Sequence, residues 1–362
     1  MSDSRWMDRA VELARQGLGT TAPNPAVGAV IVAGHTVLGE GYTRPVGGPH
    51  AEVVALRQAA EAGHDVRGAT MYVTLEPCCH HGRTPPCSDA IVEAGLARVV
   101  VGVVDPYPPM RGNSLAQLGE AGIEVSLGVR AEQCAGLVRG FTRAVIAGLP
   151  EVTCKIAASV DGHIATHAGE SKWITGEPAR LHGHRLRAEH DAILVGAGTV
   201  RADDPRLTLR GLPGSDPVPV VLDTGLRLPD DAAVLAHPRG AVIVCAEDAP
   251  ERDLPATVVR VPRGPGGVDI RAALAALVDR GLHRVLVEGG ATVHRSLLDA
   301  RFVDTLHVYL AGVLIPGGLP WLGGPPLEGL ADARRLGRPD VTPVGDDLRL
   351  TWHLDHALDQ ED

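Results

Sequence analysis

One histidine, one glutamate and two cysteines give this sequence its clearest chemical signal. His50 is followed by Glu52, and Cys78 and Cys87 come later with eight residues between them. One imidazole and two thiolates suit tetrahedral zinc and leave its fourth position open for water. Because zinc lowers the pKa of such a water to ~7, a carboxylate that does not bind the metal can move its proton. The motif therefore predicts one zinc ion per chain, held by His50, Cys78 and Cys87, with Glu52 as the proton carrier.

A closed zinc site that only stabilises a loop is the alternative interpretation of this motif. Its fourth ligand would be Cys79, His80 or His81. Glu52 argues against this alternative, because a purely structural site has no need of a carboxylate beside His50. Glu76 is expected to support this site, for example by capping a helix or by pairing with another side chain, and its role is left open.

The first part of the chain alternates helical and strand patterns, as a layered α/β domain does. The helix that begins at His50 places Glu52 in its first turn, and Val53, Val54 and Leu56 are expected on its inner side. The expected helices are 5–17, 50–62, 88–95, 115–121 and 131–147, and the expected strands are 27–32, 37–42, 71–75, 99–104 and 123–129. Strand 71–75 delivers Cys78, and Ser88 or Asp89 is expected to cap the helix after Cys87.

Gly148-Leu149-Pro150 marks the expected boundary between two domains, 1–147 and 148–362. A chain of 362 residues is long enough for both domains to bury a core. A second α/β domain is indicated by strands at 152–158, 192–195, 218–222, 241–245 and 285–287 and by helices at 177–188, 269–280 and 291–300. The segments rich in proline and glycine are expected to be surface loops, at 211–219, 262–267 and 316–326.

Composition and charge narrow the class of partner. A net charge of −10 argues against a protein that coats nucleic acid, so a small-molecule substrate fits better. The start of the chain lacks a signal-sequence pattern, and no apolar run approaches the ~20 residues of a membrane span. We expect a cytoplasmic homo-oligomer with no nucleic-acid or membrane partner. The isolated Cys134, Cys154 and Cys245 are given no role.

Several segments together resemble a known family. His-x-Glu followed by Pro-Cys and a further Cys is typical of zinc nucleobase deaminases, although those usually have two residues between the cysteines. Residues 74–78 and 82–87, with 21–25 and 49–52 upstream, resemble the deaminase domain of the bifunctional riboflavin biosynthesis deaminase/reductase family. The resemblance implies the same zinc ligands and the same role for Glu52, and it places Asn24 near the pyrimidine.

The second half resembles the reductase domain of the same family. The matching segments are 155–162, 171–176, 186–188 and 198–210, which by themselves offer hydroxyls, arginines and one Trp for an anionic ligand with a flat ring. The resemblance implies a dihydrofolate-reductase-like α/β fold that uses NADPH, after an N-terminal cytidine-deaminase-like α/β/α domain. It implies Ala157, Trp173, Thr199 and Asp203 at the nicotinamide nucleotide, and Ser171, Arg187, Leu207, Arg210 and Glu288 at the substrate.

Physical reasons also place several residues of this half at the cofactor or at the substrate. Gly289 and Gly290 allow backbone N–H groups to approach the cofactor phosphate. Arg187 and Arg210 suit a sugar phosphate, with ordinary surface arginine as the alternative. Lys155 is expected near the ribose carbonyl or the cofactor, with a salt bridge as the alternative.

The resemblance as a whole predicts an enzyme with two activities. It hydrolytically deaminates 2,5-diamino-6-ribosylamino-4(3H)-pyrimidinone 5′-phosphate and then reduces the ribosyl group to ribityl with NADPH. The alternatives are a reductase whose zinc is structural, and a zinc module that binds RNA or another protein. The sequence departs from the family pattern at Thr43, Ser114 and Gly312, none of which is a proposed ligand or proton carrier.

Overall fold

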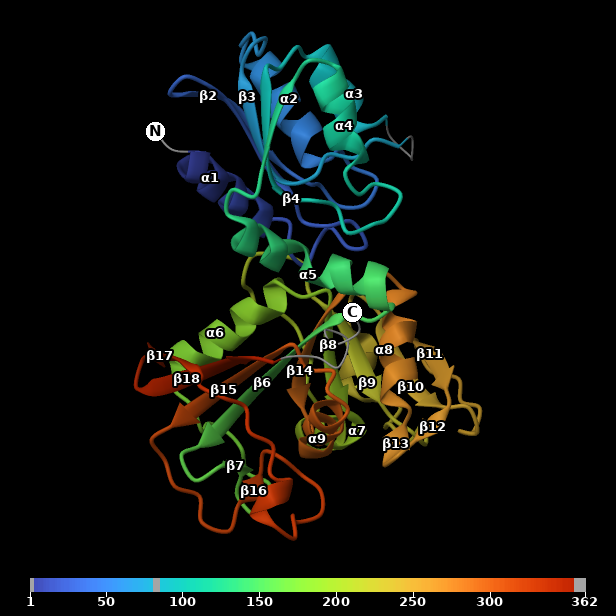
Figure 1. Cartoon of the computed structure of the whole chain (residues 1–362). Coiled ribbons are helices and arrows are strands. Elements are labelled where there is room, and N and C mark those ends of the chain that lie inside the picture. The colour runs from blue at the N-terminus through green and yellow to red at the C-terminus, as the bar shows by residue number, and fades with distance from the viewer. Residues whose placement is uncertain (1–2, 81–84, 355–362) are drawn as a thin grey trace. The chain divides into compact units, whose positions relative to one another are not determined.

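The computed structural model describes residues 3–80 and 85–354. It divides into two compact units, Met1–Gly148 and Leu149–Asp362 (Figure 1). In the described part of the chain, no helix has both the length and the apolar character needed to cross a membrane.

The first unit is built on a mixed sheet with the strand order β2-β1-β3-β4-β5. The hairpin partners β1 and β2 are antiparallel, as the sequence predicts, and β1 also runs antiparallel to β3. The neighbours β3, β4 and β5 run parallel, so their carboxyl ends meet at one edge. The strands are β1 (Gly28–Ala33), β2 (Thr36–Tyr42), β3 (Thr70–Leu75), β4 (Arg98–Val103) and β5 (Glu124–Leu127).

Helices cover both faces of this sheet, which confirms the layered α/β prediction (Figure 1). On one face α1 packs on β1 and β3 and contacts α5, which lies on β3 and β4. On the other face α2 packs on β1 and β2 and contacts α3, which in turn contacts α4. The helices are α1 (Asp3–Arg15), α2 (Ala51–Glu61), α3 (Cys87–Glu93), α4 (Asn113–Glu120) and α5 (Ala131–Ala147).

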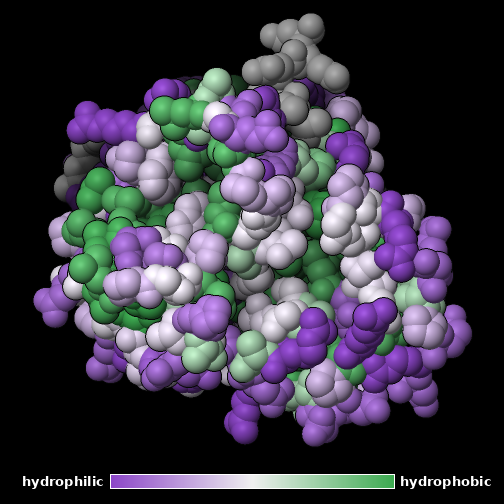
Figure 2. Space-filling view, turned by 90° about the horizontal axis from the view of Figure 1, so that it is seen from below, coloured by the Kyte–Doolittle hydropathy of each residue, from purple (hydrophilic) through white to green (hydrophobic). Residues whose placement is uncertain are grey.

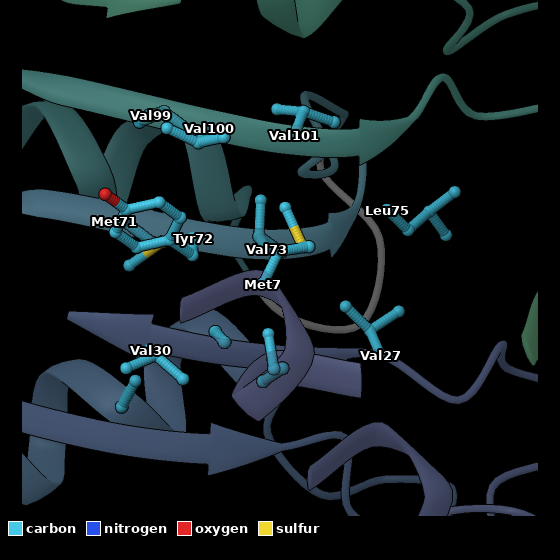
Figure 3. Close-up of a cluster of buried hydrophobic side chains, with 14 of the residues drawn as sticks. Met7, Val27, Val30, Met71, Tyr72, Val73, Leu75, Val99, Val100 and Val101 are labelled. Atoms are coloured by element: carbon cyan, nitrogen blue, oxygen red, sulfur yellow. The ribbon is translucent and has the colours of Figure 1, made fainter. Parts of the chain in front are cut away.

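The core of this unit lies on both faces of the sheet. On the α1 face, Val30, Tyr72 and Val100 are paired positions on β1, β3 and β4, and Met7 of α1 belongs to the same buried cluster (Figure 3). Val73 alternates with Tyr72 along β3 and therefore points to the other face. All five residues are buried. Burial of one such apolar side chain contributes roughly 1.5–3 kcal/mol.

The inner face of α2 differs from the sequence prediction. Val53, Val54 and Leu56 are only partly buried, whereas the fully buried side chains are Ala51, Glu52, Ala55 and Ala59. The reason lies in the neighbouring strand β2, where Gly39 and Gly41 face the helix. A Cβ atom would lie 2.2 Å from the Ala55 oxygen at Gly39 and 2.5 Å from the Ala51 oxygen at Gly41. Close approach therefore requires glycine in the strand and small residues on the helix, and it turns Glu52 inward.

The expected cap of α3 is also not formed by a side chain. Pro86 is the N-cap residue, with no side-chain hydrogen bond to the helix. The Ser88 hydroxyl instead donates to Gln117 Oε1 over 3.0 Å, and Gln117 Nε2 donates to Asp89 Oδ1 over 2.8 Å. Both side chains therefore tie α3 to α4.

The second unit contains a sheet with the strand order β11-β10-β9-β8-β14-β6-β15-β18-β17. The strands from β11 to β15 run parallel, and β18 and β17 complete one edge in antiparallel pairing. The strands of this sheet are β6 (Glu151–Ser159), β8 (Ala192–Gly196), β9 (Val218–Leu222), β10 (Ala241–Ala246), β11 (Ala256–Val261), β14 (Arg284–Gly289), β15 (Thr305–Ala311), β17 (Asp340–Val344) and β18 (Asp347–His353).

Helices and short pieces complete this unit. They are α6 (Glu177–Ala188), α7 (Ala197–Asp203), α8 (Ile270–Val278), α9 (Ala291–Asp299), the 3-10 turns η1 (Ala233–Ala236) and η2 (Leu330–Asp332), and the short strands β7 (His163–Ala165), β12 (Arg263–Gly264), β13 (Gly267–Val268) and β16 (Leu319–Pro320). The expected loops 262–267 and 316–326 thus contain paired strands. The sequence patterns did not predict α7, β11, β15, β17 or β18.

Candidate active sites

The first unit brings His50, Cys78 and Cys87 together at the carboxyl ends of its parallel strands. Their ligand atoms lie within 4.8 Å of one another. His50 Nδ1 is 3.5 Å from Cys78 Sγ and 3.4 Å from Cys87 Sγ. Tetrahedral zinc at usual bond lengths separates a nitrogen and a sulfur ligand by about 3.6 Å. These three side chains therefore fit one zinc ion by donor type and by spacing.

The electrostatics of the two thiols also suit a cation. Hydrogen bonding with Cys87 lowers the pKa of Cys78 to about 4 despite burial, and His50 adds to the effect. The same pairing with Cys78, together with burial, raises the pKa of Cys87. The pair thus favours one thiolate, and binding of a divalent cation favours deprotonation of the second thiol.

Glu52 lies in the first turn of α2, two positions after the N-cap residue His50. Its side chain is 3% exposed. Burial raises the pKa of Glu52 to about 7, with a further rise from Cys78 that His50 opposes. A carboxyl group in this environment can both hold and release a proton near neutral pH.

The described residues contain no fourth protein ligand in this cluster. His80 does not join it, and its Nδ1 atom lies 3.0 Å from Met110 Sδ instead. Cys79 is half-buried and also lies outside the cluster. His81 lies outside the described residues. The described geometry therefore favours a site with an open position over the closed alternative.

A cavity of about 310 Å³ opens onto this cluster. Asn24, His50, Glu52 and Cys78 all line it, so the structure brings the expected pyrimidine contact to the metal site. The sequence analysis named Glu76 as an open supporting residue and His80 as an alternative ligand, and both line the cavity. It gave no site role to the other lining residues, which are Pro25, Val27, Thr43, Leu75, Asp105, Tyr107, Met110, Phe141 and Val145. Asp105 could have been found, because it follows the predicted strand 99–104 at the edge where ligands bind in parallel sheets.

The second unit has its own cavity, of about 250 Å³. All six residues expected at the cofactor line it, namely Ala157, Trp173, Thr199, Asp203, Gly289 and Gly290. Lys155, Ser171 and Glu288 line the same cavity. Arg187, Leu207 and Arg210 are not among its lining residues.

Arg187 reaches this cavity through Glu288. Its Nε and Nη2 atoms donate to the two Glu288 oxygens over 2.7 and 2.8 Å, and Nη1 donates to the Thr208 carbonyl over 2.6 Å. Both side chains of the ion pair are almost fully buried. Such a two-point contact fixes the orientation of the Glu288 carboxylate at the cavity wall.

Leu207 and Arg210 have different surroundings. Leu207 is 4% exposed and belongs to a hydrophobic core cluster of the second unit, and Arg210 is exposed. Both have positive φ angles, 55° and 53°. Their expected contact with substrate is therefore not supported by the lining of this cavity.

Lys155 is partly buried, and desolvation lowers its pKa, with Glu288 opposing and Arg187 adding to the effect. Its Nζ atom lies 5.7 Å from the centroid of the Tyr309 ring. A cation over an aromatic face is attracted by the ring quadrupole, so Tyr309 helps to hold the ammonium group at the cavity.

Comparison with known proteins matches both units. Residues 150–339 match the RibD C-terminal domain, and residues 1–103 match the zinc-binding region of cytidine and deoxycytidylate deaminases. The riboflavin biosynthesis protein RibD of Bacillus amyloliquefaciens is 43% identical over 355 residues, which cover 96% of this chain and 95% of that protein. The RibD protein of Escherichia coli (strain K12) is 40% identical over 368 residues, covering 97% and 99%. This chain belongs to the RibD family.

A solved RibD-type structure agrees over both units. The diaminohydroxyphosphoribosylaminopyrimidine deaminase/5-amino-6-(5-phosphoribosylamino)uracil reductase of Thermotoga maritima matches with a TM-score of 0.89 and 36% identity, over 97% of this chain and 98% of that one. As a RibD protein, the chain is a bifunctional enzyme of riboflavin biosynthesis, a zinc-dependent deaminase and an NADPH-dependent reductase. The predicted family, both fold types, the two activities and the two cofactors are confirmed.

Glu76, left open by the sequence, anchors one wall of the deaminase cavity. One oxygen accepts from the backbone N–H groups of Asp105 and Gly112, each over 3.0 Å. The other accepts from the Ser114 N–H over 3.2 Å and from the Ser114 hydroxyl over 2.9 Å. The segment that Glu76 holds carries Asp105, Tyr107 and Met110 to the cavity. Ser114, one of the departures from the RibD pattern, thus adds a side-chain hydrogen bond to this anchor. Of the other two departures, Thr43 lines the cavity and Gly312 directly follows β15.

Replacing this anchor should weaken the deaminase alone. In Glu76→Gln an amide NH₂ would face backbone donors, and hydrogen bonds to a charged group contribute about 1.5–3 kcal/mol each. We expect kcat/KM for ammonia release to fall roughly 10- to 100-fold, because 1.4 kcal/mol corresponds to a factor of ten. Ser114→Ala, which removes one of the contacts, should have a smaller effect. Unchanged deaminase kinetics in Glu76→Gln would show that these hydrogen bonds of Glu76 do not contribute to deamination.

Proposed function

We propose that this enzyme acts on 2,5-diamino-6-ribosylamino-4(3H)-pyrimidinone 5′-phosphate in two steps. Water replaces the 2-amino group, ammonia leaves, and the ribosyl group of the product is then reduced to ribityl with one hydride and one proton. The observation that carries this proposal is the pairing of a His-Cys-Cys cluster beside Glu52 with a second cavity lined by the residues expected at NADPH. We assign the deaminase to residues 1–147 and the reductase to residues 148–362.

In the deaminase, His50, Cys78 and Cys87 would hold zinc, which when bound makes a water nucleophilic near neutral pH. Glu52 would accept a proton from the attacking water and return it to the departing amino group. Its burial supports this role, because a buried proton carrier exchanges less readily with solvent. Asn24, which lines the same cavity, would orient the pyrimidine through its amide.

In the reductase, NADPH when bound supplies the hydride. Trp173, Ala157, Thr199 and Asp203 would position the nicotinamide nucleotide. Gly289 and Gly290 would let backbone N–H groups approach its phosphates, since Gly290 precedes the first residue of α9. Ser171 and Glu288 would contact the sugar of the substrate. Arg187 would act by orienting Glu288, and the substrate roles of Leu207 and Arg210 stay predictions.

One incubation tests both halves of the proposal. Purified protein is mixed with the diaminopyrimidine phosphate, with and without NADPH, and ammonia release and NADPH oxidation are followed separately. We expect ammonia in both mixtures and NADPH oxidation only as the deaminated product accumulates. NADPH oxidation with no ammonia would favour the alternative of a reductase with structural zinc.

Loss of one thiol should separate the two activities. In Cys87→Ser the hydroxyl stays protonated and is a poorer zinc ligand, so bound zinc and ammonia release should both fall at least roughly tenfold. Reduction of the deaminated pyrimidine should be unchanged. Cys79→Ser is the matched control, because Cys79 lies outside the ligand cluster. Full zinc content in Cys87→Ser, measured by atomic emission, would argue against Cys87 as a ligand.

The proposal also includes a cytoplasmic homo-oligomer. Exposed large hydrophobic residues support self-association, because extended apolar patches on a surface favour protein contacts. Figure 2 shows hydrophobic residues (green) grouped in patches between hydrophilic ones (purple). In the second unit Val313, Leu314, Leu319, Leu327 and Leu330 are exposed. Light scattering after size exclusion and fractionation of the producing cells test these two points.

A further inference from the structure

Three polar side chains of the second unit form a hydrogen-bonded series next to Lys155. Arg349 Nη1 lies 2.7 Å from His182 Nε2, and His182 Nδ1 lies 2.5 Å from the hydroxyl oxygen of Tyr309. The three residues come from β18, α6 and β15, which lie side by side at one end of the sheet (Figure 1). None of the three lines the reductase cavity, and the proposed reactions give them no role.

The direction of these hydrogen bonds follows from the arginine. A guanidinium group only donates, so His182 Nε2 accepts. Burial lowers the pKa of His182, and the charges of Arg349 and Arg185 lower it further, so the ring is neutral near pH 7. A neutral ring whose Nε2 accepts carries its proton on Nδ1, which therefore donates to the Tyr309 oxygen. Arg349 thus fixes the tautomer and the orientation of His182, and His182 fixes the hydroxyl of Tyr309.

Tyr309 presents the face of its ring to Lys155. The tyrosine is fully buried, and burial raises its pKa, so the phenol stays neutral. Lys155 Nζ lies over this ring, 5.7 Å from its centroid. The two side chains share one face of the sheet, because Ala157, two positions after Lys155 on β6, pairs with Tyr309 on β15. The orientation of the ring therefore decides where the ammonium group is attracted.

Gly183, the residue after His182 on α6, leaves the space that the end of Lys155 occupies. A Cβ atom at Gly183 would lie 3.2 Å from Lys155 Cε and 3.6 Å from Nζ. Carbon atoms in ordinary contact are about 3.5–4.0 Å apart, so a larger residue would press on this side chain. One turn of α6 thus confines Lys155 directly through Gly183 and indirectly through His182. Lys155 itself lines the cavity together with Glu288.

We propose that Arg349 and His182 are positioning residues of the reductase, which hold the Tyr309 ring so that the Lys155 ammonium group stays at the cavity. The inference rests on the proposed function, because it takes the reduction of the ribosyl group from there. Arg349 lies in β18, beyond residue 339, where the match to the RibD C-terminal domain ends. The last hairpin of the sheet thus supports the reductase site without lining it.

The lysine content of the chain allows the surroundings of Lys155 to be measured directly. Lys155 and Lys172 are the only lysines of the sequence, so the full chain labelled with [ε-¹³C]lysine gives two NMR signals, which a Lys172→Arg spectrum assigns. Lys172 is exposed and serves as the internal reference. We expect the Lys155 signal to move towards that of Lys172 in Tyr309→Leu, which removes the ring. Arg349→Met should move it in the same direction by a smaller shift.

Reductase kinetics test whether this position matters for the reaction. Cation–π contacts correspond to a factor of about 3 to 30, so kcat for reduction of the deaminated pyrimidine should fall by this factor in Tyr309→Leu. Arg349→Met should lower it roughly threefold. The double variant should be no slower than Tyr309→Leu, because Arg349 acts through the ring that is already gone. Arg338→Met, which removes an exposed arginine just before β17, is the matched control and should keep the wild-type kcat.

The kinetic results separate positioning from a merely structural role. Effects of Arg349→Met and Tyr309→Leu that multiply in the double variant would overturn the inference. Wild-type kcat in both folded single variants would also overturn it, even where the Lys155 signal moves. If Tyr309→Leu does not fold, Tyr309→Phe replaces it, and Arg349→Met should add nothing to the loss of the hydroxyl. A wild type that does not oxidise NADPH would instead overturn the proposed function.

Discussion

A Glu52→Gln enzyme should release ammonia from the diaminopyrimidine phosphate about 10²- to 10⁴-fold more slowly than the wild type, the range typical of general acid–base catalysis. The amide keeps the shape of the side chain but cannot take up a proton. Zinc content should be unchanged, because Glu52 lies outside the ligand cluster of His50, Cys78 and Cys87. Reduction of the deaminated pyrimidine should also proceed normally. Ammonia, bound zinc and NADPH oxidation are measured on the same preparation.

Glu61→Gln is the matched control for this experiment. Glu61 is exposed and ends the same helix, so its replacement removes an equal charge without touching the cavity. We expect wild-type rates for this control. Undiminished ammonia release by Glu52→Gln would exclude Glu52 as the proton carrier and would direct attention to the other carboxylates that line the cavity, Glu76 and Asp105.

Breaking the buried Arg187–Glu288 pair should have the largest effect on the reductase domain. In Arg187→Leu the Glu288 carboxylate would remain buried without its partner, a change that costs about 3–5 kcal/mol for buried pairs. Reductase activity should fall with it, because Glu288 loses the two-point contact that orients it at the cavity. Denaturant unfolding measures the loss of stability, and reductase kinetics at low temperature, where the variant stays folded, measure the loss of activity.

The same pair makes an acid-dependent contribution to stability. Burial would raise the pKa of Glu288, but Arg187 and Lys155 overcome it and lower the pKa to about 2. The carboxyl group is thus more acidic in the folded state than its reference value of about 4.3. Its contribution is fully present above about pH 4.3 and is lost as the pH falls towards 2. Arg187→Leu should weaken this dependence of the unfolding free energy.

A double variant separates stability from function at this pair. Arg187→Leu combined with Glu288→Leu removes both charges and should regain much of the lost stability, since apolar replacement of a buried pair is often neutral. Reductase activity should stay low, because the carboxylate at the cavity is gone. Arg263→Leu, which breaks the exposed pair with Asp248, should change stability by at most about 1 kcal/mol. A stable and fully active Arg187→Leu protein would contradict the role of Arg187.

The sequence by itself determined which chemistry the chain carries. Imidazole and thiol ligands, with a carboxylate two positions after the histidine, identify a zinc hydrolase motif from residue type and order along the chain. The alternating patterns also predicted the α/β layers, because hydrophobic periodicity is a local property. The long spacing of Cys78 and Cys87 and the segments from Lys155 onward resembled both halves of one family, which the comparisons confirmed.

The tertiary structure decided which residues share a site, because that depends on strand order and helix packing. Glu76 meets Asp105 and Ser114 only because β3 and β4 are neighbours in the sheet. The inward face of α2 follows from glycines in β2, not from its own pattern of valines. Tyr309 and Lys155 converge because β15 lies beside β6, although the two residues are far apart in the sequence. Contacts of this kind leave no periodic signal in the chain, so only the fold reveals them.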